Sequence, residues 1–215
     1  MTTIFNFFIK ALVLFTAVPI HECAHAWTAE KLGDDTAKRQ GRVTLNPFAH
    51  LSLWGSIMLV LVGFGWGKPV QTNPNNFKKP KRDMALTALA GPVSNFLMAF
   101  ISMIVYKVLY YTTSTRLAYI FLYIMIINIS LAVFNFLPIP PLDGSKIFNA
   151  LLPEKIYFGI MKYENIISIV VLVLVWSGLL DTPLSFLQSK VISIMNFLTG
   201  WIDVIFSLAR GVSSV

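Results

Sequence analysis

Four long apolar segments restrict the folds open to this sequence. They cover approximately residues 4–27, 84–109, 117–137 and 166–180, the last together with its apolar flanks. A helix needs roughly 20 residues to cross about 30 Å of membrane hydrocarbon. Only 13% of the residues are charged, whereas a soluble globular domain carries about a quarter. The segments therefore predict helices that span a membrane.

Two further apolar segments allow more than one interpretation. Residues 184–208 are interrupted by polar side chains, so they either span the membrane or lie in its interface as an amphipathic helix. Residues 51–66 are short for a span and rich in glycine. Nine of the 17 Lys and Arg residues lie between Lys31 and Arg82, on both sides of this segment. Because basic residues gather on the cytoplasmic side, we expect residues 51–66 to be re-entrant or to pack against the membrane face.

The predicted fold is an all-α polytopic membrane protein with about five to six membrane helices or re-entrant segments in a single domain. Residues 42–46 and 69–73 contain β-branched side chains and precede prolines, which predicts short β-strands at the cytoplasmic membrane face. The apolar N-terminus lacks a basic region and a cleavage site, so we expect a retained membrane helix and not a removed signal. The net charge of +7 fits cytoplasmic loops better than a nucleic-acid partner.

The pattern H-E-x-x-H at residues 21–25 predicts a zinc site. On a helix, His21 and His25 lie on one face, one turn apart. Two imidazoles at this spacing can bind one Zn²⁺ at about 2.0–2.1 Å each, and Glu22 then lies near the water that the metal activates. Such a glutamate can take the proton of that water as a general base. The alternative is a pair of structural histidines with a glutamate near a helix end.

A catalytic zinc ion usually has three protein ligands and leaves one position for water. Asp143 and His50 are the candidates for the third ligand. Prolines end the membrane helix before Asp143 and would present its carboxylate from a fixed, non-helical backbone. The topology returns Asp143 to the membrane side that holds the two histidines. We therefore expect Asp143 as the third ligand, although it could instead be a turn residue, and His50 fits a loop or interface histidine.

The pairing of H-E-x-x-H with N-x-x-P-x-P-x-L-D-G at residues 135–144 closely resembles the site-2 protease family of intramembrane zinc metalloproteases. Residues 90–95, A-G-P-x-x-N, look like the central-helix motif of that family. Residues 63–70 resemble its compact bacterial subgroup, which lacks inserted PDZ or CBS domains. The resemblance covers roughly residues 15–150. Residues 1–150 are therefore expected to form the catalytic membrane core, and residues 151–215 form C-terminal membrane helices of unassigned role.

The resemblance implies specific roles for the motif residues. His21, His25 and Asp143 would bind one Zn²⁺ per chain, and Glu22 would be the general base. The partners would be the lipid bilayer and a membrane-protein substrate. Peptide bonds in transmembrane segments of that substrate would be cleaved, in regulated proteolysis or in clearance of membrane fragments. The protein would lie in a bacterial inner membrane with its active site toward the cytoplasm.

Four residues are candidates for substrate binding. The resemblance implies that Asn95 and Asn135 contact the substrate backbone or the developing oxyanion, although either amide could instead satisfy backbone carbonyls beside a proline. A substrate helix must unwind before hydrolysis, and the extended segments that contain Val70 and Val43 could align it by strand addition. The alternative for both segments is a loop that only covers the site.

Two other functions compete with proteolysis. A metal transporter or sensor would also place His and Glu in a membrane helix, but transport needs repeated ligands along a pore. The polar groups of this sequence gather at one depth instead. The other alternative is a scaffold that keeps zinc without activity.

Overall fold

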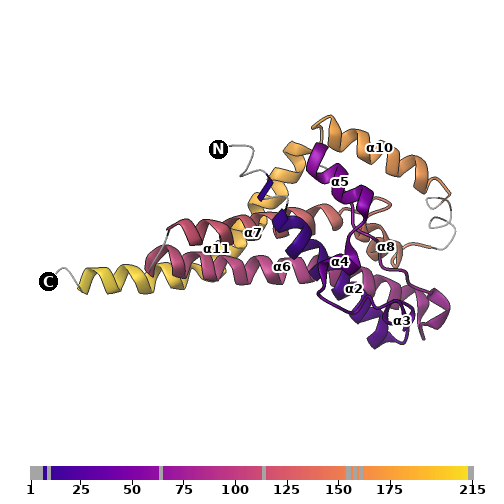
Figure 1. The fold of residues 1–215 in the computed structure, drawn as a ribbon, viewed down its shortest axis with the longest axis horizontal. Coiled ribbons are helices and arrows are strands. Elements are labelled where there is room, and N and C mark those ends of the chain that lie inside the picture. The colour runs from indigo at the N-terminus through magenta and orange to yellow at the C-terminus, as the bar shows by residue number, and fades with distance from the viewer. Residues whose placement is uncertain are drawn as a thin grey trace.

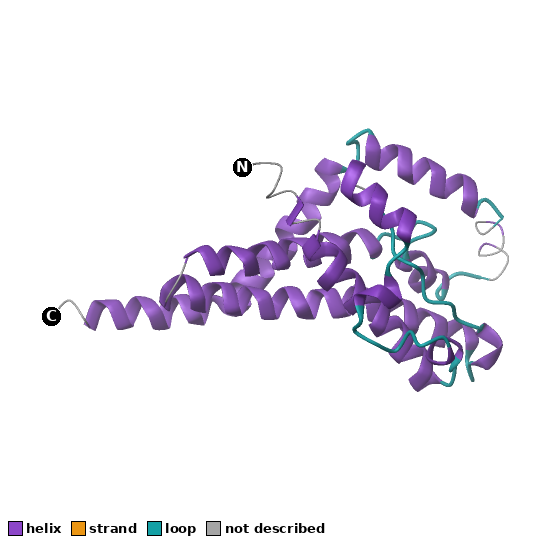
Figure 2. Cartoon of the chain, in the orientation of Figure 1, coloured by secondary structure: helices purple, strands orange, loops and turns teal. Residues whose placement is uncertain are grey.

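The computed structural model describes residues 7–8, 11–62, 65–112, 115–153, 156, 159 and 162–212. Its described elements are helices joined by loops (Figure 2). The predicted all-α membrane fold therefore fits the structure.

Three long helices form a bundle along the long axis of the molecule (Figure 1). They are α6 (Pro80–Thr112), α7 (Thr115–Asn135) and α11 (Asp181–Val212). Helix α7 packs along α6, and α11 packs against both. Among the described residues, these three helices are long and apolar enough to cross a membrane. They correspond to the apolar segments predicted at residues 84–109, 117–137 and 184–208.

The bundle is held together by apolar and small side chains. Its buried cluster consists of Ala99, Met103, Met125, Ile129, Val133 and Met195, contributed by all three helices. Gly91 and Ser102 are also buried on α6. Small residues let membrane helices approach closely, which matters because lipid provides no hydrophobic drive for helix association.

An ion pair explains how α11 can carry an acidic residue within an apolar helix. Asp203 Oδ2 lies 2.6 Å from Lys107 Nζ on α6, and the Tyr111 hydroxyl donates to Asp203 Oδ1 at 3.1 Å. Tyr111 also stacks on Phe206, with ring centroids 5.0 Å apart. Ionisable groups within a membrane pair with one another to offset their cost. This pairing and the packing of α11 in the bundle favour a span over an interfacial helix.

The other predicted spans differ from the structure. The first becomes the π-helical turn η1 (Val13–Ala17) followed by α2 (Val18–Leu32), and residues 4–6 and 9–10 of the predicted span lie outside the described residues. The fourth becomes α10 (Glu164–Trp176), whose 13 residues are too few for a span of about 20. The predicted number of five to six membrane segments is therefore not confirmed.

The two ends of the segment at residues 51–66 lie next to each other. It follows α4 (Pro47–His50) and contains α5 (Leu53–Val62), while residues 63–64 lie outside the described residues. Leu51 and Gly67 form an antiparallel bridge, and Lys68 N–H donates to the His50 carbonyl at 2.7 Å. Both ends of the segment therefore lie side by side, as a re-entrant or surface segment requires.

The short β-strands predicted at residues 42–46 and 69–73 are not confirmed, since the described part of the chain contains no strand. The second segment is held by hydrogen bonds to side chains and not by pairing with a neighbouring strand. Val70 N–H donates to the Glu22 carboxylate at 3.0 Å, and Asn73 N–H donates to Asp34 at 2.7 Å. The segment is thus fixed near both ends, and it leads through the extended backbone of Asn73 into the 3₁₀ turn η2 (Pro74–Asn76).

Candidate metal centre

Helix α2 presents the two histidines of the H-E-x-x-H pattern on one buried face. His21 and His25 are 6% and 7% exposed, one turn apart, as the spacing predicted. The helix ends at Gly33, whose φ of 110° is left-handed and whose N–H bonds to the carbonyls of the last turn. Glycine adopts this conformation without steric cost. The helix therefore holds both imidazoles in the interior of the molecule and ends shortly after them.

Asp143 reaches the histidines from the start of α8 (Asp143–Asn149). The turn between α7 and α8 contains the prolines that the sequence placed there. Gly144 allows α8 to pack on the end of α7, because a Cβ at this position would lie 2.3 Å from the Phe136 carbonyl oxygen and 2.2 Å from that of Leu137. This close return fixes the direction in which the preceding carboxylate points.

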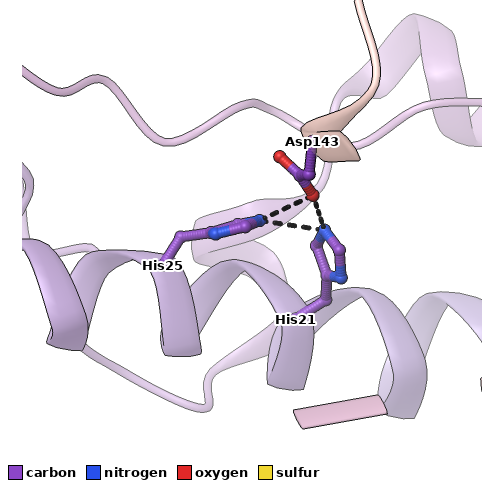
Figure 3. A group of neighbouring side chains, drawn as sticks. All are labelled: His21, His25 and Asp143. Atoms are coloured by element: carbon purple, nitrogen blue, oxygen red, sulfur yellow. Dashed lines mark hydrogen bonds and ion pairs between the residues drawn. The ribbon is translucent and has the colours of Figure 1, made fainter. Parts of the chain in front are cut away.

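Three ligand atoms from these residues converge, as Figure 3 shows. Asp143 Oδ2 lies 3.0 Å from His21 Nε2 and 3.1 Å from His25 Nε2, and the two Nε2 atoms are 3.0 Å apart. Helix α2 supplies both imidazoles and the start of α8 supplies the carboxylate. The three residues form a group that could hold a metal ion.

The hydrogen bonds on the far side of each ring determine which nitrogen carries the hydrogen. His21 Nδ1 contacts Asn95 Oδ1 at 2.7 Å, and His25 Nδ1 contacts the Thr87 carbonyl oxygen at 2.7 Å. Both partners can only accept, so Nδ1 is the donor in each neutral imidazole. Each Nε2 therefore presents a lone pair toward the other and toward the Asp143 carboxylate.

Three acceptor atoms about 3 Å apart repel one another unless a cation lies among them. Zinc binds imidazole nitrogen and carboxylate oxygen at about 2.0–2.2 Å, so tetrahedral ligand atoms lie roughly 3.3–3.6 Å apart. The observed separations of 3.0–3.1 Å are only a few tenths of an ångström shorter. The residues at this site therefore fit a zinc ion with two histidines and one carboxylate.

Gly91 on α6 leaves the room that the imidazoles occupy. A Cβ at this position would lie 2.4 Å from His25 Nε2 and 2.6 Å from His21 Cε1. Real Cβ atoms essentially never make contacts this short, so any larger side chain would displace the imidazoles. The sequence marked Gly91 only as part of a helix motif, and the structure gives the physical reason for glycine.

Glu22 lies beside this group and is held by the segment after α5. Its Oε2 accepts the Val70 N–H, and Arg42 Nη2 lies 3.9 Å from the same oxygen. Arg42 is 3% exposed and donates to the carbonyl oxygens of Ala49 and Lys68. Arg42 therefore connects the glutamate to the backbone on both sides of residues 51–66. In the sequence, Arg42 is one of several basic residues expected on the cytoplasmic side, and no sequence signal shows that an arginine is buried.

A cavity of about 440 Å³ adjoins the three ligand atoms and Glu22. Asn135 and Val70, two of the predicted substrate-binding residues, line it. The rest of its wall is mainly apolar and includes Val18, Leu59, Trp66, Met84, Leu131, Phe134 and Leu142. An apolar cavity with a few convergent polar groups is the usual form of a binding site.

The other candidates from the sequence lie elsewhere. Asn95 is fully buried behind His21 and Val43 is half-buried, and neither lines the cavity. His50 is also fully buried and separate from the ligand group, and its Nε2 contacts the Thr44 carbonyl oxygen at 2.7 Å. Burial lowers the pKa of His50 below its ordinary value, so the neutral ring at the end of α4 donates to the Thr44 carbonyl. The structure therefore places His50 at the end of α4 and outside the ligand group.

Asn128 on α7 is a site residue that the sequence analysis missed. It is fully buried and accepts a hydrogen bond from Asn95 Nδ2 at 2.7 Å. A polar amide in the middle of an apolar span is costly without a partner. An asparagine in the apolar segment at residues 117–137 could therefore have been used as a sequence signal for a buried hydrogen-bond partner.

The carboxylate of Asp34 anchors the far end of the segment that lines the cavity. Asp34 directly follows the Gly33 cap, is fully buried, and accepts from Asn73 N–H and from Asn76 Nδ2, both at 2.7 Å. Burial alone would raise the pKa of the Asp34 carboxyl, but the hydrogen bonds donated to it lower that pKa below 3.8, its ordinary value.

Replacing Asp34 with alanine should release this end of the segment. A buried donor left without its acceptor costs about 1–3 kcal/mol, so amide exchange at Asn73 should accelerate by roughly 10- to 100-fold. A carboxyl with a lowered pKa stabilises the fold above its ordinary pKa and loses this effect as the pH falls through the lowered value. Wild-type protection at Asn73 should thus persist at pH 5–7 (about one unit or more above 3.8) and decline only below 3.8. Equal exchange in both proteins would show that Asp34 does not hold the segment.

Comparison with known proteins places the chain among metallopeptidases. The model of Peptidase family M50 matches residues 9–114 and 110–178. YwhC from Bacillus subtilis, named as a candidate zinc metalloprotease, is 41% identical over 170 residues, which are 76% of this chain and 78% of YwhC. Rip2 from Mycolicibacterium smegmatis, with a similar name, is 29% identical over 134 residues, 58% of this chain and 50% of Rip2. Zinc metalloprotease MJ0392 from Methanocaldococcus jannaschii is 25% identical over 156 residues, 72% of this chain and 37% of that protein. No solved structure gives a significant match.

Proposed function

Since the chain belongs to peptidase family M50, the site-2 protease family of membrane zinc metalloproteases, we propose that it hydrolyses peptide bonds within transmembrane segments of other membrane proteins. His21, His25 and Asp143 hold the catalytic zinc ion, and Glu22 is the general base. The observation that carries the proposal is the convergence of three lone pairs beside an apolar cavity that Glu22 also lines. An apolar cavity suits a substrate segment that is itself apolar.

Glu22 moves the proton in this proposal. A bound zinc ion would supply Lewis acidity at the site, which lowers the pKa of water toward neutrality. Glu22 Oε2 is engaged by Val70 N–H, so Oε1 is the atom that takes a proton from the attacking water. The same carboxyl group then delivers this proton to the nitrogen of the leaving amine.

The backbone of residues 69–72 is the proposed site of substrate alignment. Pro69, Val70 and Thr72 line the cavity, whereas Gln71 does not line it and its side chain accepts from Gln40. The segment has no partner strand in the part of the chain that the structure describes, and it ends in the extended backbone of Asn73. An unwound substrate segment can pair with it by strand addition. Val43, which does not line the cavity, is a weaker candidate for this role.

Asn135 is the proposed contact to the reacting carbonyl. Its Nδ2 donates one hydrogen to the Leu131 carbonyl oxygen at 3.0 Å, which leaves the second amide hydrogen for a ligand in the cavity. Hydrogen-bond donors that face a developing oxyanion contribute roughly 2.7–4 kcal/mol in well-studied hydrolases. Asn95 acts through His21 in this account and does not touch the substrate.

The proposed location is the inner membrane of a bacterium, with the active site toward the cytoplasm. Exposed lysines of the segment around η2 and the start of α6 gather at the end of the bundle that carries α2. Basic residues of this kind mark the cytoplasmic side of membrane proteins.

Removal and return of zinc test the function directly. The purified protein is reconstituted in lipid vesicles with a labelled single-span substrate, treated with a strong chelator, and then supplied with zinc. Cleavage within the membrane segment should stop after chelation and recover with about one zinc ion per chain. Cleavage that continues without metal would reject the proposal. Zinc movement into vesicles without cleavage would favour a transporter.

A further inference from the structure

A row of buried amides connects helix α7 to the first histidine of the metal centre. Asn128 Nδ2 donates to the Ile124 carbonyl oxygen at 2.8 Å. Asn128 Oδ1 accepts from Asn95 Nδ2 at 2.7 Å, and Asn95 Oδ1 faces His21 Nδ1 at 2.7 Å. Asn95 and Asn128 are both fully buried. Bulk water therefore cannot replace any of these partners.

Each contact in the row determines the direction of the next. The Ile124 carbonyl can only accept, so Asn128 must point its amide nitrogen to it and its oxygen to Asn95. Asn95 must then present its nitrogen to Asn128, and its own oxygen is left for His21. The Ala17 carbonyl accepts from the same Asn95 nitrogen at 3.3 Å, a longer contact that favours the same orientation.

The direction of the row determines whether His21 can bind a metal. An oxygen facing Nδ1 requires hydrogen on Nδ1 and leaves the lone pair on Nε2, the atom 3.0 Å from Asp143. If the Asn95 amide rotated by half a turn, its nitrogen would face Nδ1, and the hydrogen would move to Nε2. The histidine would then present a donor where the metal needs a lone pair.

We propose that Asn128 is a positioning residue that sets the Asn95 amide and thereby the metal-binding tautomer of His21. The inference rests on the proposed function, because it takes His21 to be a zinc ligand. Asn128 touches neither the cavity nor the ligand group, and it acts only through Asn95. Partners that orient a metal-binding histidine typically change metal affinity by about 10- to 100-fold when they are replaced.

The test is a double-mutant cycle read out by zinc affinity and by the tautomer of His21 in the metal-free protein. Asn128→Leu removes the acceptor and lets the Asn95 amide rotate. Zinc should bind about 10- to 100-fold more weakly, and nitrogen chemical shifts should show hydrogen moving from His21 Nδ1 to Nε2. In Asn95→Asp, both carboxylate oxygens accept, so orientation no longer matters. Adding Asn128→Leu to this variant should leave zinc affinity unchanged.

Two further variants separate this role from a structural one. Asn128→Asp keeps an oxygen for Asn95 Nδ2 and should keep the wild-type tautomer and zinc affinity. Thr199→Val removes another fully buried polar group of the bundle and should change neither quantity. Equal weakening by Asn128→Leu in both backgrounds, or an Asn128→Asp variant as weak as Asn128→Leu, would overturn the inference. A wild-type protein without zinc would instead reject the proposed function.

Discussion

Replacing Glu22 with glutamine should slow peptide hydrolysis by about a hundredfold to ten-thousandfold, the usual contribution of a general base. Zinc content should stay at about one ion per chain, because the ligand atoms come from His21, His25 and Asp143. Glutamine has nearly the same shape, and its amide oxygen can still accept the Val70 N–H that Glu22 Oε2 accepts now. The substitution therefore removes the base while it leaves the surrounding backbone in place. Cleavage of a reconstituted single-span substrate, with metal analysis of the same sample, measures both quantities.

Glu30→Gln is the matched control for this prediction. Glu30 lies on the same helix, but it pairs with Lys38 at 2.8 Å and does not line the cavity. Its replacement should leave the cleavage rate unchanged. If Glu22→Gln retained the wild-type rate with zinc bound, another group would have to be the base. Loss of zinc together with activity would show that Glu22 supports the ligand geometry.

The metal centre could be predicted from sequence because its signals are local or chemically rare. The spacing of His21 and His25 gives their common helix face directly. The prolines before Asp143 mark the end of a helix, and the alternation of spans indicates the side on which that end lies. The structure adds that these three residues meet, within 3.1 Å of one another.

The roles of the residues that surround the metal ligands could not be predicted from the sequence in the same way. The resemblance implied a substrate contact for Asn95, and only the structure shows that its Oδ1 faces His21 Nδ1. Arg42 counts as one of nine basic residues until the fold buries it against Glu22. The short strands were expected from β-branched composition, but strand formation requires a partner strand, and composition does not specify one. At residues 69–73 the carboxylates of Glu22 and Asp34 occupy the place of that partner.

Prediction of the membrane segments from hydropathy is limited for a similar reason. Hydropathy identified α6 and α7 well, because each is a continuous apolar helix. It could not decide between a span and an interfacial helix for residues 184–208, since Asp203 appears unpaired in the sequence. Its partner, Lys107, lies 96 residues earlier and is brought to it by the packing of α11 on α6.

Replacing Gly91 with alanine should strongly weaken zinc binding while the fold remains intact. The new Cβ would lie 2.4 Å from His25 Nε2 and 2.6 Å from His21 Cε1. At least one imidazole must therefore move, and a zinc site that loses a ligand should bind the ion more than about a hundredfold more weakly. Alanine is favoured over glycine within a helix by roughly 0.5–1 kcal/mol, so α6 itself is not weakened. Zinc affinity from chelator competition and helix content from circular dichroism measure the two effects separately.

Gly200→Ala provides the comparison that isolates this steric effect. Gly200 also lies within a helix of the bundle, α11, but nothing lies within 4 Å of the Cβ that alanine would add. Both variants gain the same helix preference, and only Gly91→Ala brings an atom into the metal centre. Gly200→Ala should therefore bind zinc with wild-type affinity. If Gly91→Ala did so as well, the imidazoles would have to lie farther from α6 than the structure places them, and the proposed ligand geometry would be wrong.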